Sequence, residues 1–132
     1  MRMILTAPAI IAFAIAALAA PGGARDRNQI PEAIPAGEPE NCIRTISIRQ
    51  TFVRSDSVID FDMGGGKIYR NTLPHACPDL GFEEKFLYKT STSELCSVDT
   101  ITVLRDTPGG PGPTCGLGQF QPVTLVEAPK HP

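Results

Sequence analysis

Residues 58–73 constrain the fold of this chain most strongly, because they have the pattern of a β-hairpin. Apolar and polar residues alternate over the first half of the segment, as they do in a strand with one buried face. Three consecutive glycines at 64–66 permit the positive φ angles of a tight reversal. Residues 68–72 then return as a second arm. We expect the first arm to bury Ile59, Phe61 and Met63 and to expose Val58, Asp60 and Asp62.

Further strand-like segments occupy residues 43–53, 82–90, 95–104 and 123–126, with polar, Pro-containing or Gly-containing turns between them. In the first of these we expect Ile46, Ile48 and Phe52 to share one face. No helical period extends over ten residues outside the N-terminal apolar run. These patterns predict a mainly β domain, a small sandwich or barrel of five to six short antiparallel strands stapled by two disulfides.

The N-terminus indicates export. A basic Arg2 precedes an apolar run that ends in small residues, which is the order of a secretory signal peptide. We therefore expect a signal peptide at 1–19, with cleavage after Ala19 or Ala24, and a periplasmic or secreted product with no stable membrane span. The alternative is an uncleaved anchor. A flexible linker rich in Pro and Gly should occupy 20–40, the β domain 41–127 and a frayed tail 128–132.

The charge balance excludes some functions. The chain has 12 basic and 14 acidic residues and a net charge of −2. A nucleic-acid-binding protein would instead present a clustered basic surface, so we expect no nucleic-acid partner. The sequence also has no polybasic run of the kind that binds anionic membranes. No cofactor motif is present, and we expect no cofactor.

Four cysteines, all after the expected leader, predict two disulfides. Of the three connectivities we favour 77–96 with 42–115, because the second bridge would join the two ends of the domain. The sequential pairing, 42–77 with 96–115, gives similar loop entropies and remains open. A zinc site is the competing interpretation, but it normally needs closely spaced pairs. The separations between Cys42, Cys77, Cys96 and Cys115 are 35, 19 and 19 residues, so we expect no metal site.

A few polar residues are candidates for chemistry or binding. Asp60 and Asp62 resemble the start of a calcium loop, but the later ligands of that loop are missing, which favours a solvated strand face. His75 is the only imidazole of the expected domain and would have to serve any Ser-His-Asp triad, although no G-x-S-x-G elbow is present. We therefore assign no catalytic residue.

A second set of candidates is basic and aromatic. Tyr69 and Arg70 lie on the second arm of the hairpin, and Lys67 directly precedes that arm. They would form a small basic patch with Lys85, Tyr88 and Lys89 if their strands pair. The alternative interpretation is scattered surface charge.

Several motifs resemble a family of small exported bacterial proteins that carries only a domain-of-unknown-function label. The motifs are residues 59–73, Leu73-Pro74-x-x-Cys77-Pro78-x-Leu80, Leu95-Cys96-x-x-Asp99-x-Ile101 and Cys115-x-Leu117-Gly118-x-Phe120, within residues 42–122. The resemblance implies a bacterial, exported domain and brings no activity or cofactor. We expect Asp99 to cap a turn beside Cys96.

These observations lead to three hypotheses. The first is a non-enzymatic binding or interaction module of the cell envelope, whose partner is an unknown envelope protein or a small ligand. The second is a secreted inhibitor that presents the loop at 107–114. The third is a small hydrolase that uses His75 with Asp60, Asp62 or Asp99.

Overall fold

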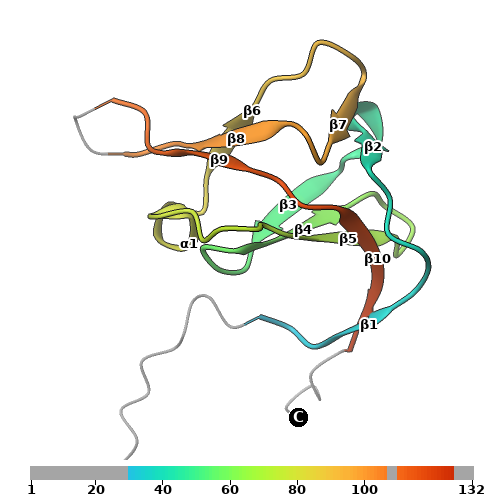
Figure 1. Ribbon diagram of the computed structural model, residues 1–132. Helices are drawn as coiled ribbons and strands as arrows, with labels where there is room; N and C mark the ends of the chain where they lie inside the picture. The colour runs from blue at the N-terminus through green and yellow to red at the C-terminus, as the bar shows by residue number, and fades with distance from the viewer. Residues whose placement is uncertain (1–29, 107–109, 127–132) are drawn as a thin grey trace, which may run out of the picture.

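A computed structural model describes residues 30–106 and 110–126. The chain is mainly β, as expected, and its strands form three small antiparallel sheets (Figure 1). The strands are β1 (Ala33–Pro35), β2 (Cys42–Arg44), β3 (Gln50–Val53), β4 (Val58–Asp62), β5 (Ile68–Thr72), β6 (Phe86–Tyr88), β7 (Glu94–Cys96), β8 (Thr100–Val103), β9 (Thr114–Gly116) and β10 (Phe120–Leu125). The expected signal peptide and the tail at 128–132 lie outside the described residues.

The sheets surround one core. The largest sheet has the strand order β1-β10-β5-β4-β3, a second contains β6-β8-β9, and β2 pairs with β7 in a two-stranded ribbon. Figure 1 shows the three-stranded sheet lying over the five-stranded sheet, with the ribbon of β2 and β7 at one end. Phe61 lies at the centre, with edge-on contacts to Phe86 and Phe120 at centroid distances of 6.3 and 5.5 Å. The two larger sheets therefore share their apolar faces.

The predicted hairpin is confirmed as β4 and β5. Phe61 lies directly opposite Tyr69, and Gly64, Gly65 and Gly66 have φ angles of 82°, 63° and 80° in the turn. The expectation that Val58 and Asp60 face solvent is wrong, since both are buried. One face of the strand packs on the core around Phe61, and Arg54, Arg70 and the segment around Pro31 cover the other face.

There are ten short strands and not five or six, because two predicted strands are each divided in two and β1 and β9 were not predicted; a third predicted strand is shortened by a helical turn. A 3₁₀ turn (Thr45–Ser47) separates β2 from β3 and leaves Ile46 82 % exposed, so Ile46 does not share a buried face with its neighbours. A single helical turn, α1 (Leu80–Glu83), precedes β6. The segment 95–104 is divided between β7 and β8. No helix among the described residues is both long and apolar enough to cross a membrane.

The expectation of a flexible linker at 20–40 is wrong for the C-terminal part of that range, because β1 belongs to the largest sheet. Its three residues pair with β10, with Ala33 opposite Leu125 and Pro35 opposite Val123. Pro35 is tolerated because β1 is an edge strand and one side of its backbone needs no partner. The ordered domain thus begins before Cys42, where the composition alone placed its start.

The disulfides are Cys42–Cys96 and Cys77–Cys115, so the favoured pairing of 77–96 with 42–115 is wrong, as is the sequential alternative. The first bridge joins directly opposed residues of β2 and β7. The second joins the segment after β5 to β9, and therefore ties the largest sheet to the three-stranded one. Strand register decided this pairing, and register is not visible in the spacing of the cysteines.

A buried amide connects β5 to the segment before β10. The Asn71 side-chain amide donates to the Gly118 carbonyl at 2.7 Å, and its carbonyl accepts from the Gly118 N–H at 2.8 Å. Asn71 is fully buried, so both polar atoms need these partners. The approach is so close that a Cβ at Gly118 would lie 2.2 Å from the Thr72 carbonyl oxygen. Only glycine fits at this position.

We predict that Gly118→Ala destabilises the protein by about 3 kcal/mol, because the added methyl group forces the two backbones apart and breaks the Asn71 hydrogen bonds. The measurement is urea unfolding of the oxidised protein. Gly116→Ala is the matched control, since a Cβ there meets no atom within 4 Å. Equal stability of the two variants would contradict the close approach.

Candidate functional site

The Asp60 carboxylate is fully buried on the outer face of the five-stranded sheet, between two arginines. Its oxygens accept hydrogen bonds from Arg54 Nε at 3.0 Å, from Arg70 Nε at 2.8 Å and from Arg70 Nη2 at 3.0 Å. Arg70 also donates to the Pro31 carbonyl at 3.0 Å, which brings the segment before β1 over the carboxylate. Arg54 stacks on the Phe52 ring at 4.7 Å from its centroid. Because of these contacts, Asp60 and Arg70 have a structural role in the sheet.

The remaining acidic candidates also have structural partners. Asp62 accepts a hydrogen bond from the Gly64 N–H at 2.8 Å and so stabilises the hairpin turn. The Asp99 carboxylate accepts from the Cys96 N–H at 2.7 Å, which confirms the expected cap beside Cys96. His75 is exposed in the segment after β5. No hydrogen bond joins His75 to Asp60, Asp62 or Asp99 within residues 30–106 and 110–126, and so no triad is assembled there.

The predicted basic patch is wrong, because its strands do not pair. Lys67 and Arg70 come from β5 and the turn before it, whereas Lys85 and Lys89 flank β6, which pairs with β8 in a different sheet. Lys85 forms an exposed ion pair with Asp106. Of the proposed set, the structure brings together Lys67 and Tyr69, with the ammonium nitrogen 5.1 Å from the centroid of the Tyr69 ring.

Lys67 and Tyr69 line an open cleft between β2 and the turn end of the β4–β5 hairpin. The cleft has a volume of about 350 Å³. Its walls combine two cations, one carboxylate, two hydroxyl groups, two apolar side chains and one half of a disulfide. They are formed by Glu40, Cys42, Ile43, Arg44, Ser47, Met63, Lys67 and Tyr69. We call this feature the Lys67 cleft.

Sequence reasoning missed Arg44, Glu40 and Ser47. They belong to a segment that was expected to be partly linker and partly strand, and nothing in its local pattern places it beside the hairpin turn. Two backbone pairings bring this segment beside the hairpin turn. Glu40 pairs with Phe120 in an isolated bridge, and Arg44 pairs with Glu94 in the ribbon. Both are contacts between segments distant in the sequence.

The polar groups of the Lys67 cleft influence one another. Burial raises the pKa of Tyr69 above its ordinary value of 10.0, and hydrogen bonding with Glu40 raises it further, whereas Lys67 acts in the opposite direction. Interaction with the Tyr69 side chain raises the pKa of Lys67 above 10.5. At neutral pH the cleft therefore holds a protonated tyrosine and a protonated lysine, and Lys67 is a permanent positive charge at its edge.

Comparison of this chain with protein-family models, with curated proteins and with solved structures finds no match. The function must therefore be argued from the arrangement of the residues.

We predict that Asp60→Asn lowers the free energy of unfolding by about 3 kcal/mol, because it leaves two largely buried guanidinium groups without their counter-charge. Asp62→Asn is the matched control on the same strand. It keeps an acceptor for the Gly64 N–H and should cost less than about 1 kcal/mol. Chemical unfolding of both variants measures the difference, and similar losses in the two would argue against the buried ion network.

We predict a further effect at alkaline pH. Tyr88→Phe leaves Tyr69 as the only tyrosine, so its ionisation can be followed by absorbance. The pKa should exceed 10.0 in the folded protein and fall on denaturation. Between the two values the unfolded chain releases a proton that the folded chain retains, so stability falls as pH rises through this window.

Two variants test the causes of that shift. Lys67→Met should raise the pKa of Tyr69 further, because Lys67 lowers it, and Glu40→Gln should lower it, because Glu40 raises it. Lys89→Met is the control and should have no effect. Shifts of the opposite sign would show that these side chains do not contact Tyr69 in this way.

Proposed function

We propose that this chain is an exported, non-enzymatic binding module of the cell envelope, and that its Lys67 cleft accepts an acidic segment of a partner protein. The observation that carries the proposal is that two cations, Arg44 and Lys67, line this cleft and neither forms a salt bridge with another described residue. Arg54, Arg70, Lys85 and Arg105 are all paired, whereas Arg49 and Lys89, the two other unpaired cations among the described Lys and Arg residues, do not line the cleft. Charges left unpaired beside a cleft favour a ligand of opposite charge.

The remaining walls suit a peptide better than a bare inorganic anion. Ile43 and Met63 provide apolar surface, whereas the hydroxyl of Ser47 provides a hydrogen-bonding group. With Arg44 and Lys67 against Glu40, the formal charge of the lining is 2 − 1 = +1. An extended segment that carries Asp or Glu next to an apolar side chain has the complementary chemistry.

Export is part of the proposal. Two disulfides are compatible with an oxidising compartment outside the cytoplasm. The signal-peptide pattern at 1–19 and the resemblance to a family of small exported bacterial proteins with a domain-of-unknown-function label point in the same direction. A partner in the envelope follows from that location.

The two other hypotheses have less support. The hydrolase needs a carboxylate to orient His75, and its three candidates are already bonded to Arg54 and Arg70, to the Gly64 amide and to the Cys96 amide. The inhibitor depends on the loop at 107–114, of which 107–109 lie outside the described residues. The binding module is therefore the hypothesis that the geometry favours.

We predict that the oxidised full chain binds hexapeptides of alternating Glu and Leu more tightly than the matching Gln and Leu peptides, and less tightly as salt is added. The double variant Arg44→Gln, Lys67→Gln should weaken this binding about tenfold, equivalent to roughly 1.4 kcal/mol. Fluorescence anisotropy of labelled peptides measures the affinity, and amide chemical shifts should change at residues 40–47 and 63–69.

The control is Lys89→Gln, Arg105→Gln, which also removes one lysine and one arginine but outside the cleft. It should bind the acidic peptide as the parent protein does. An equal loss in both double variants would mean that only net charge matters. Full competition by acetate alone would point to a small anionic ligand and not to a protein partner.

A further inference from the structure

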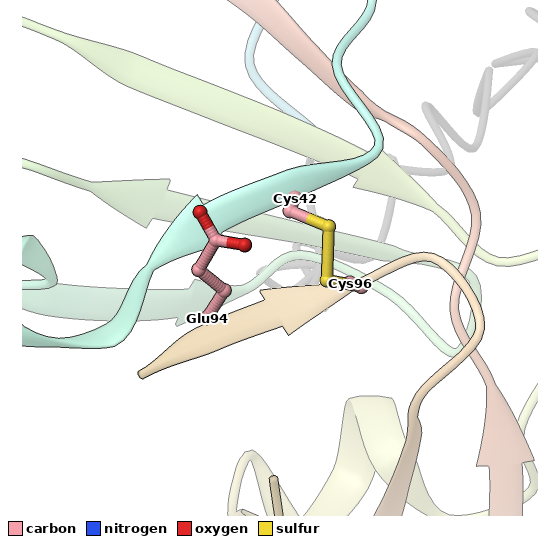
Figure 2. A group of neighbouring side chains, drawn as sticks. All are labelled: Cys42, Glu94 and Cys96. Carbon is pink, nitrogen blue, oxygen red and sulfur yellow. A yellow bond between two sulfur atoms is a disulfide. The ribbon is translucent and has the colours of Figure 1, made fainter. Parts of the chain in front are cut away.

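The disulfide Cys42–Cys96 lies on the outer face of the ribbon of β2 and β7, next to a carboxylate (Figure 2). Cys42 and Cys96 are directly opposite each other, and Glu94 precedes Cys96 by two residues on the same strand and therefore shares its face. The two sulfur atoms and a carboxylate oxygen of Glu94 all lie within 4.8 Å of one another. The strand pairing thus creates the close cysteine pair that the sequence separations argued against.

This bridge is the more accessible of the two disulfides. Cys42 and Cys96 are both half-buried, whereas in the second bridge Cys115 is half-buried and Cys77 is fully buried in the core. Thiol–disulfide exchange requires a thiolate to reach a sulfur atom of the bridge. Cys42–Cys96 therefore offers a reductant two partly exposed sulfur atoms and Cys77–Cys115 only one, so we expect Cys42–Cys96 to be reduced first.

The ribbon has other contacts that keep the two cysteines in place once the bridge is open. The inner face of the ribbon buries Ile43 and Leu95, which are 4 % and 0 % exposed. Backbone hydrogen bonds continue beyond both ends of the ladder, from the Ser97 N–H to the Asn41 carbonyl at 2.7 Å and from the Thr45 N–H to the Ser93 carbonyl at 3.0 Å.

Asp99 holds the Cys96 backbone on both sides. Its carboxylate accepts from the Cys96 N–H at 2.7 Å, and its own N–H donates to the Cys96 carbonyl at 2.9 Å. The Asp99 carbonyl accepts in turn from the Leu117 N–H at 3.2 Å, which anchors the turn to the segment before β10. The position of Cys96 therefore does not depend on the disulfide alone.

We propose that reduction of Cys42–Cys96 creates a metal site in which the two thiolates and the Glu94 carboxylate bind a thiophilic divalent cation such as Zn²⁺. Zinc–sulfur bonds of about 2.3 Å and zinc–oxygen bonds of about 2.1 Å place tetrahedral ligands roughly 3.5–3.8 Å apart. Once the S–S bond is open, rotation of the three side chains has to move the sulfur atoms apart and bring the carboxylate to this spacing. The fourth position is open to water or to a ligand group.

Both acidic and basic groups flank the site, and one carboxylate is free to bind a metal. Glu94 and Asp99 are acidic, and Arg44, the cross-strand neighbour of Glu94, forms no salt bridge with it among the described residues. The Glu94 carboxylate is exposed and is available as a ligand. Cys42 also lines the Lys67 cleft, so a bound metal would stand beside it, but neither proposal requires the other.

The redox step balances with a dithiol as the reductant. Two electrons and two protons pass from the dithiol to the bridge. The dithiol becomes a disulfide, and Cys42 and Cys96 become thiols. Binding of the metal then displaces both thiol protons to the solvent. Reoxidation of the cysteines releases the cation, so the site is present in only one redox state.

The test uses the full oxidised chain, reduced with one equivalent of a water-soluble phosphine, which takes up oxygen from water and leaves two thiols. Alkylation and peptide mapping of one aliquot should find Cys42 and Cys96 free and Cys77–Cys115 intact. Titration of the rest with Zn²⁺ against a chromophoric chelator should show one ion per chain. The oxidised protein should bind Zn²⁺ at least about a hundredfold more weakly.

The variant Glu94→Gln distinguishes a site with three protein ligands from one in which the two thiolates bind the metal alone. It should weaken Zn²⁺ binding by the reduced chain about tenfold or more, whereas Glu84→Gln, a change at another exposed carboxylate, should leave the affinity unchanged. Bound Zn²⁺ should also protect Cys42 and Cys96 from alkylation.

Four outcomes would overturn the proposal. They are prior reduction of Cys77–Cys115, equal Zn²⁺ affinity of the oxidised and reduced chains, equal affinity of the two glutamate variants, and loss of the folded amide spectrum on reduction. None of them bears on peptide binding by the oxidised protein. The two functional proposals therefore fail or succeed separately.

Discussion

The disulfide Cys77–Cys115 ties the largest sheet to the three-stranded sheet, and Cys42–Cys96 closes the third sheet, the ribbon of β2 and β7. The ribbon of β2 and β7 has only three residue pairs, and the sheet of β6, β8 and β9 is hardly larger. The bridges close loops with sequence separations of 54 and 38 residues, for which chain entropy gives about 4 kcal/mol each. That is comparable to the whole stability of many small domains, about 5–15 kcal/mol. Cys77–Cys115 is the bridge that supports the core around Phe61, because Cys77 lies in that core and the bridge ties together the two sheets that share it.

The sequence could predict the hairpin and the mainly β character of the chain because both are local. Alternation and three consecutive glycines are sufficient to define β4, β5 and their turn. It could also predict that all four cysteines are bridged, and that Asp99 caps the turn beside Cys96, since those two residues are only three positions apart. Such features require no knowledge of which strands are neighbours.

The order and register of the strands could not be predicted, and the errors follow from that. The cysteine pairing depended on the opposition of Cys42 and Cys96 across two strands that are far apart in the sequence. Asp60 was expected on a solvated face because alternation identifies two faces but not what covers each one. Here Arg54, Arg70 and the segment around Pro31 cover the second face, and a charged residue is buried because its counter-charges are buried with it.

Register also decides which chemistry the chain can present. Arg44 and Lys67 approach one cleft only because β2 lies beside the turn of the hairpin, and a one-residue slip of β2 against β7 would turn Cys42 and Arg44 toward the core. The same slip would expose Ile43, which is buried, so the apolar face of the ribbon enforces the arrangement of its polar face. Packing on one side of this two-stranded ribbon thus fixes the positions of a disulfide, a carboxylate and a cation on the other side. In a domain of this size, the same short strands supply the core with one face and the candidate sites with the other.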